Sequence, residues 1–335
     1  MSDLLYPIKF RPIYKDKIWG GLKLKTQLHR NISPLFTCGE SWEISGLIDD
    51  VSVVSNGFLA DNDLNELIEI YMYDLVGEKI YTRFGLGFPL LVKFIDAADA
   101  LSVQVHPDDR LAMEKYEQNG KTELWHVLDA DPGSGVYIGF KNGVDRKKFE
   151  QSVREGDIES LLQFHAVKKG DTFLIPAGTV HAIGKGVLLA EIQQASDITF
   201  RIFDWNRLDD EGEERELHIE EALDAIHFED DTEYRLSIEE KNNASVEVIR
   251  NPYFNINLLS FDKPIQKMYH TIDSFVIYIC TEGEVHFLYD DKVETATKGE
   301  VLLKPASMES LNLVPVQPSK LLEIYLDETD EEDTL

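Results

Sequence analysis

Lys169-Gly-Asp-Thr-Phe-Leu-Ile-Pro-Ala177 is the stretch from which the fold of this 335-residue chain is predicted. Gly170 indicates a turn, the run 172–175 a strand, and Pro176 a second turn. The same pattern returns, at a constant offset, as Lys298-Gly-Glu-Val-Leu-Leu-Lys-Pro-Ala306. A turn–strand–turn unit that occurs twice predicts two related β domains in one chain.

The segments around this repeat have the same character. Short alternating runs bounded by Gly and Pro fill much of the chain, and they resume from about Asn242. This pattern predicts a mainly β fold, of barrels or jelly rolls, with a few added helices. Asp61 or Asp63 can cap the first helix, and Gly77 can end it. Helical spacing of apolar residues predicts helices near residues 61–78, 108–118, 145–163 and 219–226.

Charge and composition exclude several classes of protein. The chain has 62 acidic and 33 basic residues, a net charge of -29, which argues against nucleic acid or an anionic membrane as a partner. Two cysteines, Cys38 and Cys280, provide no disulfide framework. The first ten residues lack the pattern of a secretion signal, so we expect a cytoplasmic protein. The acidic run 327–335 predicts a disordered tail.

A candidate metal site begins on a strand ahead of the repeat. Val103 and Val105 alternate with Gln104 and His106, and Pro107 ends the run. Because residues two apart on a strand share a face, Gln104 and His106 project together. A carboxamide oxygen and an imidazole nitrogen side by side are half of a metal site.

Two further donors follow along the chain. Glu123 shares a strand face with Lys121, and His181 comes directly after a Pro-Ala-Gly turn. These side chains can converge inside one barrel, where zinc accepts imidazole and carboxylate ligands. The alternative is that the histidines are hydrogen-bonded core residues and Glu123 is an ion-pair partner. In the repeat, His181 maps onto Ser310, so we expect the second domain to be structural.

Four motifs, in a fixed order along the chain, resemble those of one known family. The chain resembles the type I phosphomannose isomerases, in the short form that lacks a large inserted helical domain. The resemblance implies two cupin (jelly-roll) domains, with the metal in the first. The motifs are Gln-Val-His-Pro at 104–107, Lys-x-Glu at 121–123, Pro-Ala-Gly-x-x-His-Ala at 176–182 and Ser-Asp-x-x-x-Arg at 196–201.

The resemblance also implies a domain division. Residues 1–235 form the catalytic metal-binding cupin domain, including the helical segments near 61–78 and 145–163. Residues 236–326 form a second cupin-like domain without metal residues, and the acidic tail 327–335 follows.

The resemblance assigns a role to each candidate residue. Gln104, His106, Glu123 and His181 are the implied ligands of one zinc ion, and Arg201 is the catalytic arginine. Longer members often carry Asn where this chain has Ile198, so no polar side chain acts at this position, and the role of the arginine is unaffected. The catalytic base is either Lys121 or Asp197. Lys93 and Trp19 are both expected to contact the substrate. Lys93 lies in a buried apolar run, so its ammonium either extends to solvent, pairs with a carboxylate such as Glu43, or faces a polar cavity where it could bind the phosphate of the ligand.

The implied activity is aldose–ketose isomerisation of mannose 6-phosphate and fructose 6-phosphate, by metal-assisted proton transfer between C1 and C2. A non-catalytic cupin that binds a sugar phosphate as a sensor or accessory module is the alternative. A third possibility, a glucose-6-phosphate isomerase or a dioxygenase of cupin type, predicts iron, and the motif spacing disfavours it. The expected partner is a small-molecule sugar phosphate, and the expected state is a monomer or a weak homo-oligomer.

Overall fold

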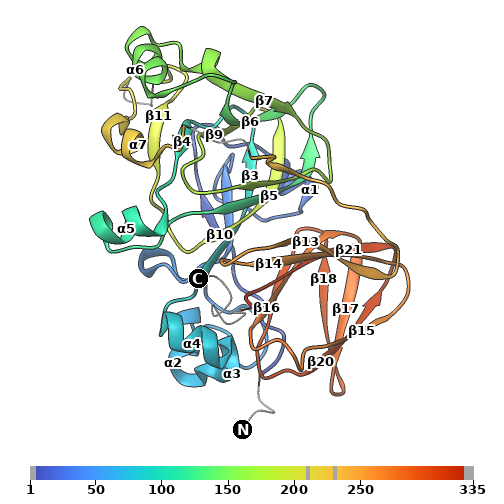
Figure 1. Cartoon of the computed structure of the whole chain (residues 1–335). Coiled ribbons are helices and arrows are strands. Elements are labelled where there is room, and N and C mark those ends of the chain that lie inside the picture. Colours follow the sequence, from blue (N-terminus) through green and yellow to red (C-terminus); the bar gives the residue numbers. More distant parts are fainter. Residues whose placement is uncertain (1–4, 209–211, 229–231, 328–335) are drawn as a thin grey trace. The chain divides into compact units, whose positions relative to one another are not determined.

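The computed structural model describes residues 5–208, 212–228 and 232–327 (Figure 1). Their contacts divide the chain into two compact units. The central unit comprises residues 14–42 and 90–236, and the terminal unit comprises residues 1–13, 43–89 and 237–335. Each unit contains two antiparallel sheets, which confirms a mainly β fold with two cupin-like domains.

The central unit contains a seven-stranded and a five-stranded sheet (Figure 1). In sheet order the larger one is β1 (Ile13–Lys15), β2 (Glu40–Ile44), β3 (Leu90–Ala97), β10 (Val187–Gln194), β5 (Glu123–Ala130), β8 (Thr172–Ile175) and β12 (Arg235–Leu236). The smaller one is β11 (Phe200–Phe203), β4 (Val103–Val105), β9 (His181–Ile183), β6 (Gly135–Phe140) and β7 (Leu162–Ala166).

Strand alternation decides which side chains lie between these two sheets. Ile95, Trp125 and Val127 of the larger sheet pack with Val136 and Ile138 of the smaller one in a single buried cluster. Residues two positions away along the same strands therefore share this interior face. The polar residues of the predicted metal site lie on that face.

Helices cover the other face of the smaller sheet. Val105 and Phe200 pack there against Phe149 of α6 (Arg146–Glu155) and Ala222 of α7 (Ile219–Ala225). Leu111 of α5 (Asp109–Tyr116) joins the same cluster. The predicted helices over 108–118 and 219–226 are therefore present. The one predicted over 145–163 is shorter, because α6 ends at Glu155 and residues 162–163 begin β7.

Local sequence explains where two of these helices begin and end. The side chains of Asp108 and Asp145 cap α5 and α6, and α6 ends at Gly156 in a left-handed conformation. The chain then forms a short 3-10 helix (Ile158–Leu161). The central unit also contains α1 (Lys23–Gln27).

The terminal unit contains a five-stranded and a four-stranded sheet, orange to red in Figure 1. Tyr278 and Phe287 pack between them, with ring centroids 5.3 Å apart. The first sheet is β13 (Ala244–Arg250), β14 (Asn255–Phe261), β21 (Ser319–Tyr325), β16 (Val276–Glu282) and β19 (Val301–Lys304). The second is β15 (Ile265–Met268), β20 (Ser310–Pro315), β17 (Glu284–Tyr289) and β18 (Lys292–Thr297).

The sequence repeat corresponds to equivalent strands in the two units. Residues 172–175 form β8, which pairs with β5, and residues 301–304 form β19, which pairs with β16. His181 begins β9 and its counterpart Ser310 begins β20.

The helical segment predicted near 61–78 lies in the terminal unit, which differs from the predicted domain division. Asp63 and Glu66 form a capping box at its start, and Gly77 ends its second helix. Asp273 accepts hydrogen bonds from the backbone of Glu78 and Lys79, a contact across about 195 residues that sequence patterns cannot reveal. The helices are α2 (Leu64–Tyr71), α3 (Tyr73–Val76) and α4 (Glu78–Phe84), after a 3-10 turn (Ile48–Asp50).

Among the described residues, no helix is both long enough and apolar enough to cross a membrane. The predicted acidic tail lies outside the described residues, apart from Asp327.

One charged side chain is buried in the terminal unit with little compensation. Lys304 is fully buried, and burial lowers its pKa to about 7. Its Nζ lies 4.2 Å from the ring centre of Tyr269 and 3.5 Å from the carbonyl oxygen of Ala306. The nearby carboxylate of Glu323 is already paired with Lys267 at 2.8 Å.

We therefore expect Lys304→Met to stabilise the protein by roughly 1–3 kcal/mol near neutral pH, because it removes the burial penalty of an amine. The unfolded chain binds the lysine proton with a pKa near 10.5 and the folded chain with one of about 7. Wild-type stability thus rises between these pH values, and the advantage of the variant shrinks. Denaturant unfolding across this pH range measures the change in unfolding free energy of Lys304→Met. The control is Lys267→Met, which breaks the ion pair with Glu323 and should lower the unfolding free energy. A destabilised Lys304→Met protein would contradict the account.

Candidate metal centre

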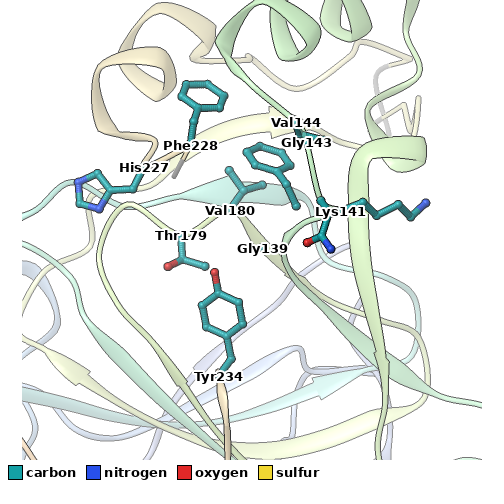
Figure 2. Close-up of a pocket in the computed structure, with 11 residues that line it drawn as sticks. Gly139, Lys141, Gly143, Val144, Thr179, Val180, His227, Phe228 and Tyr234 are labelled. Atoms are coloured by element: carbon teal, nitrogen blue, oxygen red, sulfur yellow. The ribbon is translucent and has the colours of Figure 1, made fainter. Parts of the chain in front are cut away.

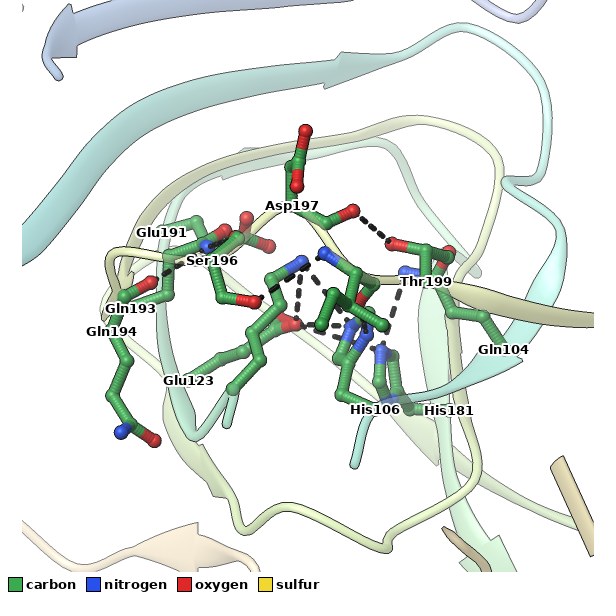
Figure 3. Close-up of polar contacts among 12 residues, drawn as sticks. Gln104, His106, Glu123, His181, Glu191, Gln193, Gln194, Ser196, Asp197 and Thr199 are labelled. Atoms are coloured by element: carbon green, nitrogen blue, oxygen red, sulfur yellow. Dashed lines mark hydrogen bonds and ion pairs between the residues drawn. The ribbon is translucent and has the colours of Figure 1, made fainter. Parts of the chain in front are cut away.

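Three buried donor groups meet between the sheets of the central unit. His106 follows β4, Glu123 begins β5 and His181 begins β9. One ligand atom from each lies within 4.8 Å of the others. His106 Nε2 is 2.6 Å and His181 Nε2 is 3.8 Å from Glu123 Oε1, and Figure 3 shows all three side chains pointing toward one another.

Backbone carbonyls fix the tautomers of the two histidines. His106 Nδ1 lies 2.8 Å from the carbonyl oxygen of Ile198, and His181 Nδ1 lies 2.9 Å from that of Thr179. Since a carbonyl can only accept, each Nδ1 carries the hydrogen and donates. Each Nε2 therefore presents a lone pair toward Glu123.

Glu123 Oε1 consequently faces two imidazole acceptors, and the nearest positive charge is the ammonium of Lys121, 3.3 Å away. Glu123 is fully buried, and its Oε1 accepts no hydrogen bond although an imidazole nitrogen lies 2.6 Å away. Two lone pairs at this separation repel each other unless a cation or a proton lies between them. The donor atoms of the three residues thus fit a metal ion.

Electrostatics keep this donor set deprotonated. Burial and the charge of Lys121 lower the pKa of His106 to about 3, and burial also lowers the pKa of His181. Burial alone would raise the pKa of Glu123, but the neighbouring ammonium of Lys121 holds it well below its usual value. Neutral imidazole and ionised carboxylate are the forms that bind metals.

Two more predicted residues join the group. Lys121 Nζ lies 3.3 Å from both Glu123 Oε1 and His106 Nε2. Gln104 Nε2 lies 3.3 Å from His181 Nε2 and can donate to its lone pair. Rotating the carboxamide of Gln104 by half a turn would bring Oε1 to this position.

Lys93 is held beside the group by the carboxylate of Glu191, a residue that no sequence motif singled out. Lys93 and Glu191 face each other on β3 and β10, with Nζ 3.0 Å from Oε1. Burial and the charge of Glu123 raise the pKa of Glu191, whereas Glu191 and Glu40 raise that of Lys93 against the effect of burial. Glu191 is the one carboxylate in the buried run 187–194, just as Lys93 is the one ammonium in its own buried run. The same reasoning from burial could therefore have identified Glu191 in the sequence.

Arg201 lies directly opposite Gln104 in the ladder between β11 and β4, so both side chains share the interior face. Its Nη1 donates to the carbonyl oxygen of Glu216 at 2.8 Å, while its buried Nε makes no hydrogen bond. Burial and the neighbouring Arg215 lower the pKa of Arg201. The guanidinium is cationic and has donor capacity to spare.

The structure does not bring Asp197 or Trp19 into this group. Asp197 is exposed, and its carboxylate points away from the histidines in Figure 3. Trp19 is buried among apolar residues beside Ala97, about 13 Å along β3 from Lys93. Their proposed roles in catalysis and substrate binding remain predictions.

Gln193, also missed from the sequence, holds the loop beside the metal group. Its Nε2 donates to the carbonyl oxygens of Gln194, at 3.0 Å, and Ser196, at 2.7 Å. This loop carries the Ile198 carbonyl that orients His106. No motif identifies such a residue, because its role depends on the strand register.

A cavity of ≈ 560 Å³ lies elsewhere in the central unit (Figure 2). Thr179 lines it and also supplies the carbonyl that orients His181. Among the described lining residues, none belongs to the metal group. They are Gly139, Phe140, Lys141, Asn142, Gly143, Val144, Thr179, Val180, His227, Phe228 and Tyr234.

Comparisons with known proteins give one consistent result. A family model for the catalytic domain of type I phosphomannose isomerases matches residues 8–126. A mannose-6-phosphate isomerase from Streptococcus mutans serotype c is 41% identical over 220 residues, 66% of this chain and 67% of the relative. The mannose-6-phosphate isomerase ManA of Bacillus subtilis is 33% identical over 314 residues, 92% of this chain and 95% of the relative.

Solved structures agree with the sequence comparisons. The crystal structure of the mannose 6-phosphate isomerase from Bacillus subtilis matches with a TM-score of 0.86 and 32% identity, covering 96% of this chain and 99% of the other. A variant of the phosphomannose isomerase from Salmonella typhimurium matches with a TM-score of 0.78 at 18% identity, covering 96% of this chain and 100% of the other. The second match supports the fold alone.

Because His106 stays neutral over this range and burial lowers the pKa of His181 below its usual value, protons should compete less for this site than for two ordinary imidazoles. We expect the dissociation constant for zinc to change by less than about tenfold between about pH 8 and about pH 5.5. Two imidazoles with the ordinary pKa of 6.5 would lose roughly 100-fold in affinity over this range. Competition with a chelator calibrated at each pH measures the difference, and a loss of about tenfold or more would contradict the assigned protonation states.

Proposed function

The chain belongs to the type I phosphomannose isomerase family, and we propose that His106, Glu123 and His181 form the metal centre of its active site. The protein is an aldose–ketose isomerase that interconverts mannose 6-phosphate and fructose 6-phosphate. Family membership favours this activity over a non-catalytic sugar-phosphate sensor. The observation that carries the site is the buried Glu123 Oε1, which faces two imidazole lone pairs.

We propose that the metal is zinc, one ion per chain. Two neutral imidazoles and one carboxylate are a common catalytic zinc donor set, and a fourth ligand position stays available. The carboxamide oxygen of Gln104 is the proposed additional protein ligand, since this side chain already contacts His181. When bound, the ion would supply Lewis acidity toward the oxygens at C1 and C2 of the sugar.

Isomerisation moves a proton between C1 and C2, which needs a positioned acid–base group. Of the two residues predicted for this task, Lys121 is buried within the metal group and Asp197 is exposed outside it. We therefore favour Lys121, whose Nζ can exchange a proton with substrate close to Glu123 and His106. Glu191 lies close by as a buried carboxylate with a raised pKa.

Negative charge develops on a sugar oxygen while the proton is in transit. Arg201 faces the interior beside Gln104 and has donor groups that are not used by the protein. A fixed guanidinium stabilises such an oxyanion without reorganisation of solvent. Lys93, which is buried and cationic, is the proposed contact for the anionic substrate. This sugar-phosphate substrate fits the cytoplasmic location predicted from the sequence.

The first test is a coupled assay with mannose 6-phosphate that detects fructose 6-phosphate. Removal of the metal with a chelator should reduce turnover to background, and zinc should restore it. Chelator-resistant turnover would refute the metal centre. Absence of turnover in protein that holds zinc tightly would instead refute catalysis by this site.

Arg201→Ala should lower kcat/KM by about 100–1,000-fold and leave the zinc content unchanged, because a charge-stabilising donor is lost while the ligands stay. Arg201→Lys should restore little, since an ammonium does not reproduce the planar guanidinium. Asp197→Asn is the matched control, four residues earlier in the loop that leads into β11, and we expect near wild-type turnover. A near wild-type rate for Arg201→Ala would refute the role of the guanidinium, and a large loss for Asp197→Asn would reinstate Asp197 as the base.

A further inference from the structure

Trp125 occupies a position between two buried carboxylates. It lies on β5 two residues after Glu123, on the same interior face, and directly opposite Glu191 on β10. Its indole is fully buried. The Nε1–H donates to Glu123 Oε2 at 3.0 Å and to Glu191 Oε2 at 2.9 Å.

This shared hydrogen has a consequence for the geometry of Glu123. One carboxylate oxygen, Oε1, faces the histidines, and the other, Oε2, accepts from the indole. Rotation of the carboxylate about its terminal bond, away from this orientation, would lose the hydrogen bond from the indole. The indole therefore favours one orientation of the ligand.

We propose that Trp125 is a positioning residue of the metal centre, whose indole N–H holds Glu123 so that Oε1 alone binds the metal. The same N–H connects Glu123 to the Glu191–Lys93 ion pair, so it fixes the metal ligand relative to these two groups. This inference rests on the proposed metal centre. Hydrogen bonds from neighbouring residues to a metal ligand commonly change metal affinity by about 10–100-fold.

The indole also has a packing role, and the test must separate the two. Trp125 belongs to the apolar cluster between the sheets, and its ring packs edge-on against His181 with centroids 5.4 Å apart. Trp125→Phe keeps an aromatic ring and removes the N–H. Trp205→Phe is the matched control, because Trp205 Nε1 donates to the carbonyl of Leu101 at 2.6 Å in the same unit.

Zinc affinity is measured for both variants by competition with a chelator, and thermal unfolding is followed on the metal-free proteins. We expect Trp125→Phe to bind zinc about 10–100-fold more weakly than wild type, and Trp205→Phe to stay within about threefold. Equal affinity of Trp125→Phe and wild type, or equal losses in both variants, would overturn the inference. A wild-type protein that binds no zinc would instead refute the metal centre, and the inference with it.

A second measurement needs no perturbing variant. The chain has four tryptophans, so the indole N–H groups give four signals in a nitrogen-15 spectrum. Saturation with zinc should shift the Trp125 signal more than the Trp205 signal, because zinc withdraws charge from the carboxylate that accepts from Trp125. Site-specific labelling of Trp125 assigns its signal even if Trp125→Phe fails to fold. An unmoved Trp125 signal in zinc-loaded protein would overturn the inference.

Discussion

The arrangement of the central unit depends on one buried carboxylate oxygen, Glu123 Oε1, that has no hydrogen bond of its own. Backbone carbonyls hold the Nδ1 hydrogens of His106 and His181, so the lone pairs of both rings are directed at this oxygen. A protein interior does not tolerate such a cluster of acceptors without a positive charge. Lys121 supplies one such charge at 3.3 Å, the proposed metal ion would supply another, and the strands of the fold keep the donors together.

The surrounding charges follow from that constraint. Lys121 lies next to Glu123, and Lys93 lies next to Glu191, so each buried carboxylate has a buried ammonium within 3.3 Å or less. In a chain of net charge -29, these two ammoniums offset the negative charge of the buried carboxylates at this place. Trp125 joins the two pairs through a single N–H, which makes the polar interior one connected network.

The sequence predicted the parts of this protein that depend on local patterns. The motifs predicted Gln104, His106, Glu123 and His181 as one group, and the structure brings them together. Glu191 and Trp125 escaped prediction because their importance comes from the pairing of β10 with β5, which adjoin only in the folded sheet. Likewise, the helices over 64–84 belong to the terminal unit through contacts with residues such as Asp273, which are distant in sequence.

The most direct test of the account is the position of the metal itself. Crystals of the zinc-loaded protein should show one strong anomalous peak at the zinc absorption edge, about 2.0–2.2 Å from Glu123 Oε1, His106 Nε2 and His181 Nε2. Glu123 should bind through Oε1 alone, with Oε2 still hydrogen-bonded to Trp125. A peak ligated by other residues, or no peak within bonding distance of Glu123, would contradict the central claim.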